Sequence, residues 1–357
     1  MKKKKKKQER DFSALGYIFL FAIMAGFMVF LMYFSTNQRS KDVTVPQKQE
    51  AKINLQKPAT EKPTLGNNLQ NFETYNYRIA YTFDIQGTIN DVFFRIPIPT
   101  TENEKQYILN SNTSIKPTKI YYDGATTFAE FNFPELKTQK LTIEHNGTAQ
   151  VRTYDLKTAK LINKNKNPEK DINRYLKDEQ YIEVNDALVK SYAAKIKGDT
   201  KEEIIKNIYE FTQNHLTYKH LKGVSGAKKA LKDRVGECSE YSAIMVALCR
   251  AKGIPARIVI GNIAREENSK HNWVEVYFDE YGWVTFDPTN MPIVVNIYKN
   301  GKLVKQEKKL DSNKSISRYI VSGKNLFSPY IFRYKSDSPN TGRAGIKETV
   351  EIKKVKK

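Results

Sequence analysis

The chain has 357 residues, of which 39% are hydrophobic and 11% aromatic, and it carries a formal net charge of +21. This apolar content can bury more than one core, so it excludes a disordered chain and favours two or three domains. The excess of Lys and Arg suits an anionic surface, such as lipid headgroups or acidic wall polymers.

The N-terminal region has the pattern of a membrane anchor. Residues 14–34 are uncharged and apolar, and as a helix they would be about 31 Å long, which matches the hydrocarbon thickness of a bilayer. A cleaved signal peptide is the competing interpretation, but the run is long for one and no small-x-small cleavage pattern follows it. The basic residues of 1–13 predict a cytoplasmic tail, so the rest of the chain is expected to be extracytoplasmic.

Two segments of different character follow the anchor. Residues 35–71 are rich in Lys, Gln, Pro, Thr and Asn, which is typical of a flexible linker. Residues 72–155 contain period-two alternation with turn signals between the runs, which predicts an antiparallel β-sandwich. The expected strands are 75–85, 92–98, 119–122, 126–133, 141–144 and 149–154.

The second half begins with a helical pattern. Residues 156–200 are expected to form a helical connector that contains a helix over 186–196. A further helix is expected directly after it, over 201–215. Thr200 and Glu203 suggest a capping box at the start of the latter. A second core, with both helices and strands, is predicted over 201–293. Residues 294–357 are β-prone and basic, and Lys299-Asn300-Gly301 signals a hairpin.

Cys238 is the first residue to which the sequence assigns a candidate chemical role. It precedes an amphipathic stretch that runs to Lys252, so it is expected at a helix N-terminus, where the helix dipole and free amides favour thiolate over thiol. A buried structural cysteine is the plainer interpretation, and it fits Cys249 better. The two cysteines would lie about 16 Å apart along one helix, too far for a disulfide.

A base and an orienting carboxylate follow downstream. His271 opens one strand-like segment and Asp287 closes the next, with a turn between them. If Phe278 paired with Trp283 across a four-residue loop, Asp287 would face away from His271. A Cys238-His271-Asp287 triad therefore requires an odd-length loop or a bulge near Gly282.

These motifs together resemble the transglutaminase-like superfamily. The similar parts are Gly236-x-Cys238, Leu248 to Arg257, His271-x-Trp273-x-Glu275 and Trp283 to Thr289. The resemblance covers roughly residues 201–292. It implies an α+β, papain-related core with Cys238, His271 and Asp287 as its triad, preceded in bacterial members by a β-sandwich.

The chain also departs from that pattern. Animal cross-linking transglutaminases have Gln before and Trp after the nucleophile, where this chain has Glu237 and Ser239. Tyr218 is the candidate for a second oxyanion donor, and Trp273 is expected to fill the core. No metal or cofactor is predicted, because neither a metal-ligand cluster nor a glycine-rich phosphate loop is present in the sequence.

The sequence thus predicts a membrane-anchored, extracytoplasmic thiol enzyme at the cell envelope. Its substrates would be proteins or peptides, and its reaction acyl transfer or hydrolysis at amide bonds. A non-catalytic module that binds envelope proteins or peptides is the alternative. Nucleic-acid binding is not expected, because the basic residues occur without aromatic or glycine-rich readout motifs.

Overall fold

The computed structural model describes residues 51–52, 72–102, 105–123, 126–162, 169–264, 270–289, 293–299, 302–309, 315–320, 330–336 and 342–356. The predicted cytoplasmic tail and membrane helix lie outside these residues, as does the predicted linker apart from 51–52. None of the helices in the described part combines the length and apolarity that crossing a membrane needs.

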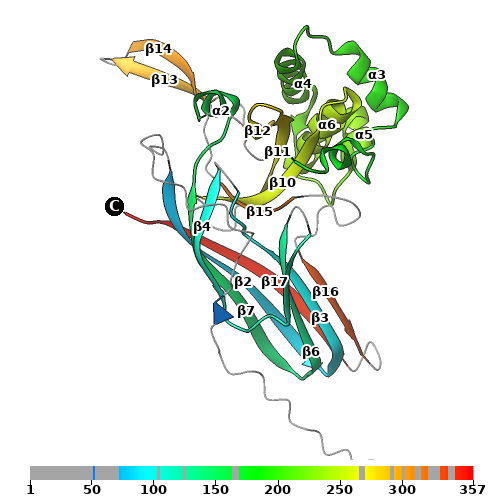
Figure 1. The fold of residues 1–357 in the computed structure, drawn as a ribbon, viewed down its shortest axis with the longest axis vertical. Helices are drawn as coiled ribbons and strands as arrows, with labels where there is room; N and C mark the ends of the chain where they lie inside the picture. Colours follow the sequence, from blue (N-terminus) through cyan, green and yellow to red (C-terminus); the bar gives the residue numbers. More distant parts are fainter. Residues whose placement is uncertain are drawn as a thin grey trace, which may run out of the picture. The chain divides into compact units, whose positions relative to one another are not determined.

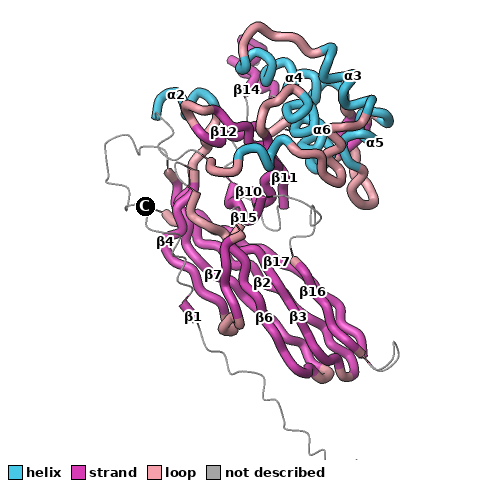
Figure 2. The backbone as a smooth tube through the Cα atoms, turned by 45° about the vertical axis from the view of Figure 1, so that its right-hand side comes forward, coloured by secondary structure: helices cyan, strands magenta, loops and turns pink. Residues whose placement is uncertain are grey.

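The N-terminal half of the described chain forms two antiparallel sheets, drawn as long strands in Figures 1 and 2. One sheet has the strand order β1-β4-β7-β2-β17 and the other the order β16-β3-β6-β5. The strands are β1 (Ala51–Lys52), β2 (Glu73–Gly87), β3 (Ile89–Ile98), β4 (Gln106–Thr113), β5 (Lys119–Tyr122), β6 (Thr127–Leu136), β7 (Gln139–Val151), β16 (Ile331–Lys335) and β17 (Gly342–Lys354).

Aromatic side chains from both sheets form one buried cluster. The alternation predicted for residues 75–85 is confirmed, because every second side chain of β2 from Tyr75 to Ile85 is buried. Phe83 of β2 packs edge-on against Phe94 of β3, with ring centroids 4.7 Å apart. Because the two rings belong to different sheets, this contact joins the sheets through their apolar faces.

One predicted break in the strands is wrong. Residues 141–144 and 149–154 were expected as separate strands, because Asn146-Gly147 looks like a turn. The structure has one strand there, β7, which pairs with β2 and β4 without a turn. The glycine serves packing instead: a Cβ on Gly147 would lie 2.4 Å from the hydroxyl of Tyr77.

The two C-terminal strands complete both sheets. β17 pairs with β2 from Gly342 opposite Gly87 to Lys354 opposite Tyr75, and β16 pairs with β3. Nothing in the local pattern of these strands indicates their partners, which lie more than 200 residues earlier. The C-terminal segment is therefore part of the same two sheets as the strands of residues 73–151.

The helices lie beside a third sheet, which has four strands in the order β12-β11-β10-β15, as Figure 1 shows. Its strands are β10 (Ala256–Ile263), β11 (Lys270–Phe278), β12 (Gly282–Phe286) and β15 (Ser315–Ile320). The helices are α2 (Leu156–Ile162), η1 (Ile172–Leu176), α3 (Ala187–Lys195), α4 (Lys201–His215), α5 (Gly226–Asp233) and α6 (Cys238–Ala251). A parallel pair, β8 (Thr217–Tyr218) and β9 (Val235–Gly236), and the hairpin β13 (Ile293–Lys299) and β14 (Lys302–Lys309) complete the described elements.

The predicted helices over 186–196 and 201–215 correspond to α3 and α4. Thr200 caps α4 by accepting the backbone N–H of Glu203 at 3.2 Å. The carboxylate of Glu203 reaches back to the N–H of Asp199, one residue before the position that a capping box uses. α6 differs from both, since all residues from Glu240 to Arg250 are buried, so it is the central helix of this core.

The two large sheets contain a buried histidine that predicts a pH-dependent stability. His145 is fully buried and bonds to Ser111, and burial, followed by the charge of Arg318, lowers its pKa to about 3. Below about pH 6.5 the imidazole of His145 therefore binds a proton in the unfolded chain but not in the folded chain. Between pH 7 and 5 this difference should remove about 2 kcal/mol from the free energy of unfolding. Denaturant titrations of the wild type and His145→Asn should differ in this pH dependence, and equal slopes would contradict it.

Candidate active site

Cys238 is the first residue of α6, as the sequence predicts. It is a free, partly exposed thiol, whereas Cys249 is fully buried in the core. Burial raises the pKa of the Cys249 thiol to about 12, so Cys249 remains protonated at neutral pH. Of the two cysteines, Cys238 alone has the exposure and the helix-end position of a nucleophile.

A reciprocal capping box fixes the start of α6. The Glu237 carboxylate accepts the backbone N–H of Glu240, and the Glu240 carboxylate accepts that of Glu237 at 3.1 Å. A Cβ on Gly236 would lie 2.4 Å from the Cβ of Glu240, so the glycine of the Gly-x-Cys motif makes room for this cap. The residue pattern around Cys238 therefore serves the geometry of the helix end.

The two capping carboxylates also bind the chain that precedes α5. The N–H of Leu221 donates to Glu237, and the N–H of Ser225 donates to Glu240 at 2.8 Å. Glu240 is fully buried, and these bonds satisfy its oxygens. The segment 217–225 is thus attached to the residues on either side of Cys238.

The hairpin from β11 to β12 brings His271 and Asp287 to one face. Phe278 pairs with Gly282 across a three-residue loop, and the register continues to Val274 opposite Phe286. Paired residue numbers therefore have an even sum, and the two odd-numbered residues project from the same side. The three-residue loop therefore has the odd length that the sequence analysis required for His271 and Asp287 to meet.

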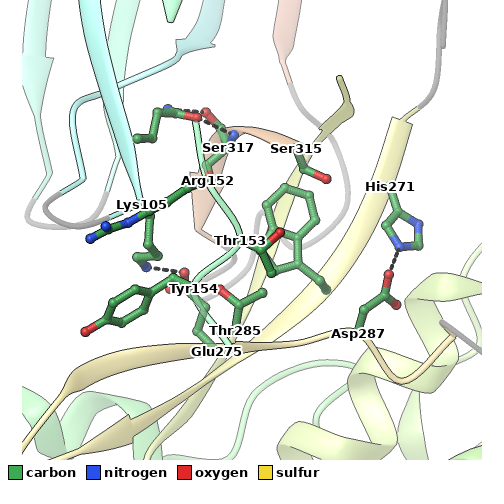
Figure 3. A pocket seen from close by; sticks show the side chains of 12 residues that line it. Lys105, Arg152, Thr153, Tyr154, His271, Glu275, Thr285, Asp287, Ser315 and Ser317 are labelled. Atoms are coloured by element: carbon green, nitrogen blue, oxygen red, sulfur yellow. Dashed lines mark hydrogen bonds and ion pairs between the residues drawn. The ribbon is translucent and has the colours of Figure 1, made fainter. Parts of the chain in front are cut away.

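His271 and Asp287 are directly hydrogen-bonded, as Figure 3 shows. The distance from Nε2 of His271 to Oδ2 of Asp287 is 2.8 Å. Thr289 donates to the other carboxylate oxygen from its hydroxyl at 2.6 Å and from its N–H at 3.1 Å. The Tyr209 hydroxyl donates to the backbone carbonyl of Asp287 at 3.0 Å. Asp287 is therefore held on both its side chain and its main chain.

The electrostatics of the pair favour a charged imidazole. Burial disfavours the imidazolium of His271, but hydrogen bonds to Asp287 and Cys238, and the charges of both groups, outweigh it and raise its pKa to about 10. Burial would raise the pKa of Asp287 too, yet the bond to His271, its charge and the bonds from Thr289 hold it below the usual range. Because Asp287 occupies Nε2, the other ring nitrogen is left for Cys238.

Tyr218 lies next to this group. It sits on β8 opposite Gly236 of β9, two residues before Cys238, and its side chain is about half exposed. Burial, followed by the charges of Cys238 and Glu237, raises the pKa of its phenol. The structure therefore brings Tyr218 close to Cys238, with its hydroxyl kept protonated as a hydrogen-bond donor.

A buried ion cluster lies four residues along β11 from His271. Glu275 is fully buried and bonds to Lys105, which precedes β4, and to Nε of Arg257 at 2.8 Å. Burial would raise the pKa of Glu275, but the charges of Lys105 and Arg257 outweigh it and keep the carboxylate ionised. Arg257 also stacks 4.1 Å from the ring centroid of Trp283.

A small cavity connects this cluster with the His271–Asp287 pair (Figure 3). Its volume is about 50 Å³, which suits a few water molecules. Trp273 lies in its wall and is buried, in keeping with the core role that the sequence predicts. The lining residues are Lys105, Gln106, Arg152, Thr153, Tyr154, His271, Trp273, Glu275, Thr285, Asp287, Ser315 and Ser317.

Sequence reasoning assigned no role to several supporting residues. Thr289 stands in the Asp-Pro-Thr motif, so its place directly after the carboxylate was the available signal. Tyr209 and Lys105 carry no such signal, because only tertiary contacts bring them to Asp287 and Glu275. Within the described ranges, no group of three or more His, Cys, Asp or Glu side chains is arranged to hold a metal ion.

Part of the chain matches a known protein family. Residues 190–288 match the family model of the transglutaminase-like superfamily. They form a transglutaminase-like domain. The match contains Cys238, His271 and Asp287, and it begins within α3, before the predicted start of the core at residue 201.

Two curated proteins resemble parts of the transglutaminase-like domain. "Uncharacterized protein YebA" of Bacillus subtilis (strain 168) is 44% identical in an alignment over 71 residues. The alignment covers 16% of this chain and 10% of that protein. A "Protein-glutamine gamma-glutamyltransferase" of Pseudomonas aeruginosa is 38% identical over 79 residues, 19% of this chain and 12% of that protein. The chain therefore spans about a tenth of the length of these relatives.

A solved structure matches more of the fold. The protein described as "a Putative Cysteine Protease from Cytophaga hutchinsonii" aligns with a TM-score of 0.57 over 80% of this chain and 92% of its own. Its sequence identity is 18%, so this likeness concerns the fold alone.

Removing the carboxylate of the buried ion cluster should lower the free energy of unfolding far more than removing one of an exposed ion pair. Glu275→Leu should lower the free energy of unfolding by about 3 kcal/mol, because Lys105 and Arg257 lose their shared buried counter-charge. Glu202→Leu, which removes the partner of exposed Lys160, should have a much smaller effect, because solvent screens this pair. Denaturant unfolding of both variants makes the comparison, and equal effects would refute it.

The raised pKa of His271 can be measured directly by NMR. The imidazole should titrate near pH 10 in the wild type, so it is protonated throughout the neutral range. Asp287→Asn removes a hydrogen-bonded negative charge, so the midpoint should move to lower pH. Cys238→Ala should also lower it. An unchanged midpoint in Asp287→Asn would show that the carboxylate does not control the protonation of His271.

Proposed function

We propose that this protein is a cysteine-nucleophile enzyme that performs acyl transfer or hydrolysis at amide bonds of peptides or proteins. The observation that carries the proposal is one constellation: Cys238 at the N-terminus of α6, His271 interacting with it, and Asp287 bonded to Nε2 of His271. The proposed roles are nucleophile, acid and base, and orienting group, in that order.

The proposed chemistry follows from these contacts. The Cys238 sulfur bonds to the amide carbon, His271 gives its proton to the leaving amine, and the C–N bond breaks to leave a thioester. Water or a second amine then attacks the thioester while His271 takes a proton, which releases the acyl group and restores the thiolate. The same three residues serve either acceptor, so both hydrolysis and transamidation belong to the proposal.

Oxyanion stabilisation is assigned to the start of α6 and to Tyr218. The backbone amides at a helix N-terminus are donors for a developing negative charge. Tyr218 supplies a protonated hydroxyl near Cys238, and its strand is fixed by pairing with β9. This placement supports Tyr218 as the second donor of the oxyanion hole.

The proposed setting is the outer face of a cell membrane. Its support is the uncharged run of residues 14–34 behind a basic tail, which is the pattern of a single-pass anchor. We further propose that the two large sheets form a β-sandwich domain ahead of the transglutaminase-like domain. Envelope proteins or peptides are the proposed substrates, and anionic wall polymers a proposed contact of the basic surface.

A non-catalytic module that binds envelope peptides is the rival function. It would need neither a reactive thiol nor the His271–Asp287 bond. The three bonds that hold Asp287, from His271 and Thr289, favour the enzyme, because orienting a carboxylate toward an imidazole has no use in a binding surface.

Alkylation of the full-length chain with iodoacetamide distinguishes the two functions. Cys238 should react rapidly at pH 6, and His271→Ala should slow the reaction at least tenfold, because the variant lacks the positively charged imidazole that interacts with the sulfur. Labelling is assigned by mass, with Cys238→Ala as the blank.

Cys249 is the internal reference, since its burial should leave it unlabelled in the native protein. Slow labelling of Cys238 that is indifferent to His271→Ala would instead favour the binding module.

A further inference from the structure

The segment 217–223 forms part of the surface beside Cys238. Its main chain is bound to the residues before α6: the N–H of Thr217 donates to Arg234 and that of Lys219 to Gly236, both at 2.9 Å. The Leu221 N–H adds a third bond, to Glu237. Residues 217–220 and 222–223 are nevertheless exposed. The segment is thus fixed in position while its side chains face solvent.

Three exposed lysines lie on the two segments that flank Cys238. Lys219 and Lys222 belong to the fixed segment, and Lys270 precedes His271 on β11. Lys270 interacts electrostatically with Glu348, Arg318 and, more weakly, with Cys238. We call Lys219, Lys222 and Lys270 the cationic rim.

Several lysines on the neighbouring helices have carboxylate partners within 4 Å: Lys160, Lys201, Lys206, Lys228 and Lys229. Among the described residues, Lys219 and Lys222 have no ion pair of this kind. Their positive charge therefore faces solvent and, across the residues that the structure describes, is not neutralised by a neighbouring carboxylate.

The acidic groups near Cys238 are already engaged. Asp287 is paired with His271, and Glu237 caps α6, binds Leu221 and lies 3.6 Å from His220. His220 would add to the positive charge when protonated. These carboxylates are thus bonded to other groups, whereas Lys219 and Lys222 are exposed to solvent.

From this arrangement we propose that the cationic rim selects acidic polypeptide segments, so that the amide attacked by Cys238 is flanked by Asp or Glu. This inference rests on the proposed function and names its substrate class. The rim would act by attracting and orienting the substrate, because exposed charges act over distances comparable with the Debye length, which is about 10 Å at 0.1 M salt.

Charged alkylating reagents test the rim without reference to turnover. The rate ratio of anionic iodoacetate to neutral iodoacetamide at Cys238 of the full-length chain is compared with that of 2-mercaptoethanol. At low salt the protein's ratio should be about fivefold higher, and it should approach the reference at high salt, where the Debye length is short. A ratio equal to the reference at low salt would overturn the proposal.

Charge reversal locates the effect. Lys219→Glu with Lys222→Glu should lower the ratio roughly tenfold, and Lys270→Gln roughly twofold. The matched control is Lys140→Glu with Lys347→Glu on β7 and β17, which changes the net charge equally at exposed sites on the other sheets and should leave the ratio unchanged. Equal effects of both double variants would assign the ratio to net charge and overturn the rim.

The substrate itself is tested with paired amide peptides that carry Glu or Lys beside the reacting residue. The wild type should favour the Glu peptides at least fivefold in kcat/KM, and the Lys219/Lys222 double variant should reverse the order. Loss of His271-dependent iodoacetamide labelling reports on the proposed function, whereas the reagent ratio reports on the rim. The two failures are therefore distinguishable.

Discussion

The complete burial of α6 is the constraint on which the rest of the transglutaminase-like domain depends. A helix buried from Glu240 to Arg250 must be enclosed on every side, and α3, α4, α5, β10 and β11 provide that enclosure. The ends of the helix are partly exposed, and Cys238 lies at the N-terminal end. The packing of an apolar helix thus determines where the nucleophile meets solvent.

Burying this helix also requires that its polar groups be satisfied inside the protein. Glu240 accepts bonds from Glu237, Ser239 and Ser225, and Arg250 donates to the carbonyls of Ala256 and Lys177 and to Glu179. These charges tie the ends of α6 to separate segments of chain. The same bonds that compensate for desolvation therefore fix the loops around Cys238 and the connection from η1.

The two large sheets take part in positioning the core sheet. Lys105 supplies a second cation to Glu275 on β11, and the side-chain amide of Gln106 exchanges two hydrogen bonds with Ser317 on β15. The adjacent residues Lys105 and Gln106, at the start of β4, thereby hold both the strand that carries His271 and the strand at the sheet edge. A shift of this chain segment would affect β11, because the buried carboxylate of Glu275 would lose one of its two cations.

The sequence by itself determined the local elements and the chemical types at the site. The spacing of apolar residues located α3 and α4, the break at Gly236-Glu237 placed Cys238 at a helix start, and strand parity set the condition for His271 to meet Asp287. Each of these depends on neighbours within a few residues, where periodicity and capping act. Only the tertiary structure decided the loop length between β11 and β12, the return of β17 to β2, the continuity of β7 past Gly147, and the reach of Lys105 to Glu275. Those outcomes depend on contacts between distant segments, and no local pattern encodes which partner a strand or a buried charge will find.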